Sequence, residues 1–94
     1  MIYFSIVIPV YNRPKKIINA LESIRRQSEY SQSEVIIVDD STDSTTQEIK
    51  KYKSNFPYIK IELIKPQERA GPSKARNIGI KSCKGKVVIF FDSD

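Results

Sequence analysis

Acidic residues follow two strongly apolar segments of the sequence. Asp39 and Asp40 come directly after the run at residues 35–38, and Asp92 and Asp94 come after a second run of the same kind. Short, uninterrupted apolar runs are typical of buried parallel strands. In an open α/β sheet, ligands bind beyond the carboxyl ends of the strands. The two acidic pairs therefore predict a polar site at that edge of a sheet.

The two pairs suit different chemistry. Asp92 and Asp94 are separated by one residue, Ser93, and alternate residues of an extended segment point the same way. Both carboxylates could therefore reach one Mg²⁺ or Mn²⁺ ion, which would keep coordination positions open for phosphate oxygens. Asp39 or Asp40, directed into the crevice, could instead accept a hydrogen bond from the imide N–H of a pyrimidine.

Residues 9–12 follow the first apolar run and supply further candidates. Pro9 is expected to end that strand, which would place Tyr11 at the carboxyl edge of the sheet. A flat aromatic side chain there could stack on a nucleotide base, or it could simply cover the first helix. Asn12 suits a helix cap better than a ligand contact.

The segment at residues 71–79 combines glycine with basic residues. Gly71 precedes an expected helix N-terminus, which favours anions, and Lys74 and Arg76 add positive charge near it. The segment matches neither the dinucleotide-binding glycine pattern nor the P-loop, and an exposed basic helix explains it equally well. Gly79 is expected to allow close contact between this helix and the sheet.

The elements that would position these residues alternate between strand and helix patterns. The third strand alternates polar and apolar residues, which indicates an edge, whereas the fourth is wholly apolar and indicates a central strand. We predict a three-layer α-β-α fold of the α/β class with a parallel sheet in the order 3-2-1-4. The expected strands lie at residues 4–8, 34–38, 59–63 and 87–91, and the expected helices begin near residues 14, 44 and 72 and end near residues 28, 56 and 84.

Composition narrows the classes of function. The 94 residues suit one small domain, and the absence of histidine excludes histidine catalysis and histidine metal ligands. The single cysteine, Cys83, excludes an internal disulfide. Sixteen Lys and Arg against eleven Asp and Glu give a net charge of +5, which indicates a solvated surface or an anionic partner such as a nucleotide diphosphate or an acidic membrane face. Nucleic acid is a poorer match, because aromatic residues do not interleave with a compact basic stripe.

Taken together, four segments resemble the family 2 glycosyltransferases, which have the GT-A nucleotide-diphospho-sugar transferase fold. The order and spacing of these segments match across essentially the whole chain. The matching segments are residues 5–12 (SIVIPVYN), residues 38–43 (VDDSTD), Gly71 with residues 75–79 (ARNIG), and residues 91–94 (FDSD).

The resemblance implies roles for individual residues. Tyr11 would stack on the nucleotide base, usually uracil, and Asp40 would form a hydrogen bond with the base, supported by Asp39. Arg76 would lie beside the base and the ribose. Pro9 and Asn12 belong to the same matching segment and are counted with the nucleotide-binding residues.

The resemblance also implies a metal site and a reaction. Asp92 and Asp94 would form the DXD motif that binds Mn²⁺ or Mg²⁺, with Asp94 the more direct metal ligand and Asp92 nearer the ribose. The expected reaction is metal-dependent transfer of a sugar from a nucleotide-diphospho-sugar, usually a UDP-sugar, to a hydroxyl group of a saccharide or lipid-linked acceptor.

The family's domain normally continues past the DXD motif, and the part beyond it carries the acceptor site and the catalytic base. We therefore expect residues 1–94 to be a single nucleotide-sugar-binding domain truncated after that motif, with no catalytic residue and no turnover alone. An uncovered fourth strand would favour homo-oligomers. The expected location is the cytoplasm, with the inner face of a membrane as an alternative.

Two other classes of function stay open. One is a nucleotide-binding module without transferase activity. The other is a receiver-like phospho-acceptor domain, whose acidic pocket also follows an apolar strand. That fold places its acid pair after the first strand and its acceptor aspartate after the third, whereas here the third strand is followed by Lys65 and Pro66.

Overall fold

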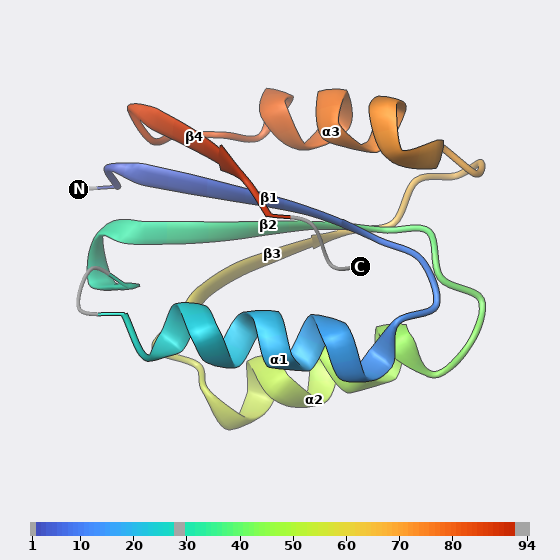
Figure 1. The fold of residues 1–94 in the computed structure, drawn as a ribbon, viewed down its shortest axis with the longest axis horizontal. Helices are drawn as coiled ribbons and strands as arrows, with labels where there is room; N and C mark the ends of the chain where they lie inside the picture. Colours follow the sequence, from blue (N-terminus) through green and yellow to red (C-terminus); the bar gives the residue numbers. More distant parts are fainter. Residues whose placement is uncertain (1, 28–29, 92–94) are drawn as a thin grey trace.

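The computed structural model describes residues 2–27 and 30–91. Strands and helices alternate along the chain, apart from one short 3-10 helix, and Figure 1 shows their arrangement. The elements are β1 (Phe4–Val10), α1 (Pro14–Arg25), η1 (Tyr30–Gln32), β2 (Ser33–Asp39), α2 (Thr45–Asn55), β3 (Lys60–Ile64), α3 (Gly71–Lys81) and β4 (Val87–Phe90).

The strands form one parallel sheet in the order β3-β2-β1-β4, as the sequence predicts. Helices α1 and α2 cover one face of the sheet, and α3 covers the other (Figure 1). The predicted three-layer α-β-α fold is confirmed. Because all four strands run in the same direction, their carboxyl ends meet at one edge of the sheet.

Residues alternate between the two faces of the central strands. On one face, Ile8 and Ile37 belong to a buried cluster with Leu21 of α1 and Ile49 of α2. On the other face, Val7 and Val38 pack beneath α3, where Ala75 and Gly79 are buried. Strands covered on both sides need the continuous apolar runs that the sequence shows.

Two boundaries differ from those expected. Pro9 does not end β1, which continues to Val10, because Pro9 lies past the ladder that joins Phe4 and Val7 to β4 and therefore needs no N–H donor toward β4. Helix α1 ends at Arg25 rather than near residue 28, in a tight turn.

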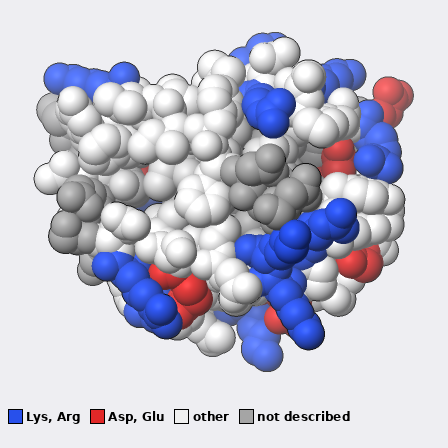
Figure 2. All heavy atoms as spheres, viewed as in Figure 1, with Lys and Arg blue, Asp and Glu red and all other residues white. Residues whose placement is uncertain are grey.

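Strand β4 is not central among the described residues. It pairs with β1 alone and lies at an edge of the sheet, and its four side chains are 37–48% exposed. Figure 2 shows Lys and Arg around the rim of this face of the molecule and mainly uncharged atoms over β4. Self-association through this edge stays a prediction. None of the described helices has the length and apolar character needed to cross a membrane.

The opposite, amino edge of the sheet is closed by a buried carboxylate. Glu34 Oε2 accepts hydrogen bonds from Ser5 Oγ and from the Lys84 amide, both at 2.6 Å, and Ser5 Oγ in turn accepts one from the Gly85 amide at 2.8 Å. These contacts fix the turn that connects α3 to β4. Burial also raises the pKa of the neighbouring Cys83 thiol.

The contact between α3 and the sheet depends on Gly79. A Cβ atom there would lie 2.4 Å from Val7 Cγ1, and a valine side chain has little rotamer freedom to move away. We expect Gly79→Ala to lower the free energy of unfolding by about 1–2 kcal/mol, because the overpacking exceeds the gain in helix propensity. Urea unfolding measures the change, with exposed Ser73→Ala on the same helix as the control. An unchanged or higher stability for Gly79→Ala would contradict the close contact.

Candidate functional site

A cavity of about 290 Å³ lies at the carboxyl edge of the sheet. It is formed by the ends of β1 and β2, the segment before α3, and the first two turns of α3. Its lining includes Pro9, Tyr11, Asp40, Arg69, Gly71 and Arg76. The structure thus brings together four of the predicted nucleotide-binding residues, Pro9, Tyr11, Asp40 and Arg76, from three segments far apart in the chain.

Asp40 connects the end of β2 to the start of α3. Its side chain is 8% exposed, and Oδ2 accepts hydrogen bonds from the Ala70 amide at 3.0 Å and the Gly71 amide at 3.1 Å. These N–H groups belong to the helix N-terminus, where a negative charge is favourable. The anion at this helix N-terminus is therefore a carboxylate of the chain itself. The φ angle of +77° at Gly71 is one that only glycine adopts readily.

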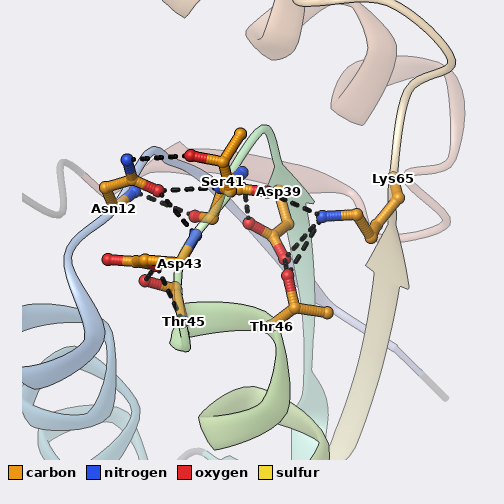
Figure 3. Close-up of polar contacts among 8 residues, drawn as sticks. Asn12, Asp39, Ser41, Asp43, Thr45, Thr46 and Lys65 are labelled. Carbon is orange, nitrogen blue, oxygen red and sulfur yellow. Dashed lines mark hydrogen bonds and ion pairs between the residues drawn. The ribbon is translucent and has the colours of Figure 1, made fainter.

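Asp39 points away from the cavity and is fully buried. Its carboxylate accepts hydrogen bonds from the Ser41 amide at 2.9 Å and from the Thr46 hydroxyl, and Lys65 Nζ lies 3.5 Å from it (Figure 3). Burial alone would raise the pKa of Asp39, but the hydrogen bonds from Thr46 and Ser41 and the charge of Lys65 together lower it. Asp39 thus stays ionised and stabilises the loop instead of lining the cavity.

Lys65 helps to hold the loop after β2, a role that the sequence analysis did not suggest. Besides Asp39, its ammonium group donates hydrogen bonds to the Ser41 carbonyl at 3.1 Å and to Thr46 Oγ1 at 3.0 Å. The residue follows the last position of β3, which is the neighbour of β2. A lysine one residue past a strand, beside a strand that ends in two aspartates, is the signal that could have identified it.

Asn12 joins the loop after β1 to the loop after β2 (Figure 3). Its backbone N–H donates a hydrogen bond to Ser41 Oγ at 2.9 Å. Its side-chain Oδ1 accepts hydrogen bonds from the backbone amides of Thr42 and Asp43 at 2.8 and 3.3 Å, and its Nδ2 donates one to Thr42 Oγ1 at 3.2 Å. It does not cap α1, whose N-cap position is Arg13 and has no side-chain capping hydrogen bond. The expectation of a helix cap was wrong, because Asn12 adopts a positive φ of 50° and faces the other loop.

The exposed aromatic side chain of the cavity is already in contact with a cation. Tyr11 is 40% exposed, and the guanidinium carbon of Arg69 lies 3.8 Å from the centre of its ring. Arg69 Nε is also 3.9 Å from Asp40 Oδ2. Arg76, on the second turn of α3, is half-buried in the wall of the cavity. Arg69, two residues before Gly71, was not among the expected site residues.

The predicted metal ligands Asp92 and Asp94 lie outside the described residues. Within residues 2–27 and 30–91, no group of three or more His, Cys, Asp or Glu side chains is arranged to hold a metal ion. Strand β4 runs toward the carboxyl edge, and the Phe91 amide just after it donates a hydrogen bond to the carbonyl of Val7, in the middle of β1, at 2.9 Å.

Comparisons with known proteins agree on one family. The family model described as glycosyl transferase family 2 matches residues 5–94. The poly(ribitol-phosphate) beta-N-acetylglucosaminyltransferase TarS of Staphylococcus aureus is 38% identical over 96 residues, which cover 100% of this chain and 16% of TarS. The chain therefore spans only a small part of this relative.

Two solved structures show the same fold. The structure of S. aureus TarS 1–349 in complex with UDP-GlcNAc superposes with a TM-score of 0.87 at 35% identity, over 99% of this chain and 27% of that one. The mannosyltransferase PcManGT from Pyrobaculum calidifontis, in complex with GDP-Man and Mn²⁺, superposes with a TM-score of 0.91 at 28% identity, over 97% of this chain and 27% of that one.

The contacts of Asn12 lead to a prediction about stability. Asn12→Gly should lower the free energy of unfolding by about 1–3 kcal/mol, because backbone donors of the β2 loop lose their acceptor. Asn12→Ala should cost about 1 kcal/mol more, because alanine is strained at positive φ and glycine is not. Denaturant unfolding of both variants tests this, with the exposed helix residue Asn19→Ala as the control. Equal losses for glycine and alanine would contradict the strained backbone.

Proposed function

The chain belongs to glycosyl transferase family 2, and on that basis we propose that it is the donor-binding part of a glycosyltransferase that transfers a sugar from a UDP-sugar to an acceptor hydroxyl. The observation that carries the proposal is the cavity in which Tyr11, Asp40 and Arg76 meet at the carboxyl edge of the sheet. The structure of TarS 1–349, which superposes on 99% of this chain, has been solved with UDP-GlcNAc bound.

The base is assigned to Tyr11 and Asp40. The ring of Tyr11 offers a flat surface on which a base can stack, and such stacking contributes about 1–3 kcal/mol per base. Asp40 Oδ2 accepts hydrogen bonds from two backbone amides, which hold the carboxylate in place, and its other oxygen, Oδ1, is assigned to the base. A carboxylate oxygen suits a base with a ring N–H, which uracil and guanine present and cytosine and adenine do not.

The ribose and the diphosphate are assigned to the other charged residues. Arg76 lies in the cavity wall, where its guanidinium can bind oxygen atoms of the ribose or the phosphates. Asp92 and Asp94 would hold Mn²⁺ or Mg²⁺, for which carboxylate oxygens are suitable ligands. Support comes from the sequence pattern and from the Mn²⁺ in the PcManGT complex. When bound, the ion would neutralise the departing diphosphate.

The proposal divides the reaction between this chain and further residues. Nothing in the described cavity is assigned as the base that deprotonates the acceptor, and no acceptor site is assigned. The 94 residues cover 16% of TarS, so the chain is proposed to bind the donor and not to turn it over alone. The receiver-like alternative is set aside, because such folds place their sheet in the order 2-1-3-4-5 and not β3-β2-β1-β4.

The role of Tyr11 gives a direct test. We expect Tyr11→Ala to weaken UDP binding about 10- to 100-fold, which corresponds to the loss of one stacked base. The matched control is Tyr3→Ala, because Tyr3 is 41% exposed, against 40% for Tyr11, but lies at the opposite edge of the sheet. Calorimetric titration measures both variants. Similar UDP affinities for the wild type and Tyr11→Ala would contradict stacking on this ring.

The metal gives a second test. UDP and Mn²⁺ should bind with positive coupling of about 1–3 kcal/mol, because the diphosphate and the two carboxylates share one cation. Removing the metal with a chelator, or replacing Asp94 by Asn, should remove most of that coupling. Glu68→Gln, which neutralises an exposed loop carboxylate, serves as the control. If UDP affinity is the same with and without Mn²⁺ in the wild type, the assignment of Asp92 and Asp94 is wrong.

A further inference from the structure

We propose that Arg69 is an internal competitor of the nucleotide base: in the ligand-free protein its guanidinium occupies the face of Tyr11, and the base must displace it. The inference rests on the proposed function, because it concerns the same cavity. It adds a residue and a step that neither the sequence pattern nor the geometry of Tyr11 and Asp40 alone implies.

The distances leave room for only one partner on this face of the ring. The guanidinium carbon of Arg69 lies 3.8 Å from the centre of the Tyr11 ring, which is direct contact between two planar groups. A base could not enter between them without moving one of them. Arg69 also lines the same cavity as Tyr11, Asp40 and Arg76, so its position is inside the proposed site and not beside it.

Arg69 lies beside both residues that are assigned to the base. Its guanidinium is flat and lies over the aromatic ring, and its Nε lies 3.9 Å from Asp40 Oδ2. A base with a ring N–H would likewise present a flat face to Tyr11 and a donor to Asp40. In the absence of a nucleotide, the guanidinium of Arg69 therefore takes the position over Tyr11 and beside Asp40 that is proposed for the base.

The surroundings allow the side chain to leave while the site keeps its shape. The side chain of Arg69 is 59% exposed, and its Nε lies 3.9 Å from Asp40 Oδ2, beyond hydrogen-bond distance, so this contact holds it only weakly. The backbone beside it is fixed, because the amides of Ala70 and Gly71 donate to Asp40. Rotation of Arg69 into solvent would thus uncover Tyr11 without moving Asp40.

An uncharged ligand separates this proposal from ordinary electrostatic effects. Salt weakens the attraction between Arg69 and Asp40 by screening. If Arg69 competes with the base, salt should make uridine, which has no phosphate, bind the wild type more tightly. Simple attraction between the basic protein and a nucleotide would give the opposite dependence on salt, and only for ligands with phosphate.

The test is a titration of the chain with uridine, followed by NMR, for the wild type, Arg69→Ala and Arg26→Ala. Arg26 is an exposed arginine on the other side of the molecule and controls for the loss of one charge. We expect Arg69→Ala to bind uridine about 3- to 10-fold more tightly than the wild type, and Arg26→Ala to match the wild type. Raising the salt from about 20 to about 500 mM should tighten binding to the wild type and leave Arg69→Ala unchanged.

Three other outcomes would overturn the proposal in distinguishable ways. Unchanged affinity in Arg69→Ala means that the arginine does not compete, and weaker binding means that it holds the base from the other face; in both cases the base site itself stands. If uridine and UDP bind neither protein, the base site fails, and the competitor fails with it. As a check without ligand, the Arg69 side-chain protons should be shifted by the Tyr11 ring in the wild type, and Tyr11→Leu should remove that shift; unshifted resonances would exclude the contact.

Discussion

The buried carboxylate of Asp39 is the constraint on which the carboxyl edge of this sheet depends. A strand that ends in two aspartates directs one to each face, and here Asp39 is directed into the protein, where an unpaired charge would cost several kcal/mol. The loop after β2 supplies the Ser41 amide, the start of α2 supplies the Thr46 hydroxyl, and the residue after β3 supplies the Lys65 ammonium. The contacts that satisfy this one charge therefore hold together the end of β2, the start of α2 and the end of β3.

The contacts of Asp39 also determine the shape of the cavity. Once the loop after β2 is held by Asp39, Asn12 can bind its Thr42 and Asp43 amides, which positions the loop after β1 and with it Tyr11. On the other side, Asp40 holds the start of α3. The site is thus assembled before any ligand arrives, and a preorganised site loses less conformational entropy on binding. The movable group is the side chain of Arg69, which lies on the surface of this framework.

The sequence predicts the framework better than the contacts that complete it. Uninterrupted apolar runs indicate parallel strands, and residues at the carboxyl ends of such strands meet at one edge, so the placement of Tyr11 and Asp40 together follows from pattern alone. The partners of Asn12 could not be predicted in this way, because its positive φ is set by contacts with residues 29–31 positions away. Arg69 was missed for a related reason, because a basic residue in a polar loop has no sequence pattern that identifies its partner. Lys65 differs, because its position one residue past β3, beside the acidic end of β2, is a signal that could have been used. The apolar character of β4 suggested a central strand, but β4 lies at the edge, because the apolar content of a strand does not determine which strands pair with it.

A comparison of the acidic residues on β2 and beside it explains why a ligand is expected at one edge and not the other. Glu34, at the amino edge, binds Ser5 and the Lys84 amide, and Asp39 binds Ser41, Thr46 and Lys65. The hydrogen-bonding capacity of these two carboxylates serves the fold. Asp40 differs, because its two backbone donors occupy one oxygen and its nearest charged neighbour is an exposed arginine at 3.9 Å. Of the three, Asp40 combines a fixed position in the lining of the cavity with an exposed aromatic ring in the same lining, and for that reason it is the carboxylate proposed to bind the base.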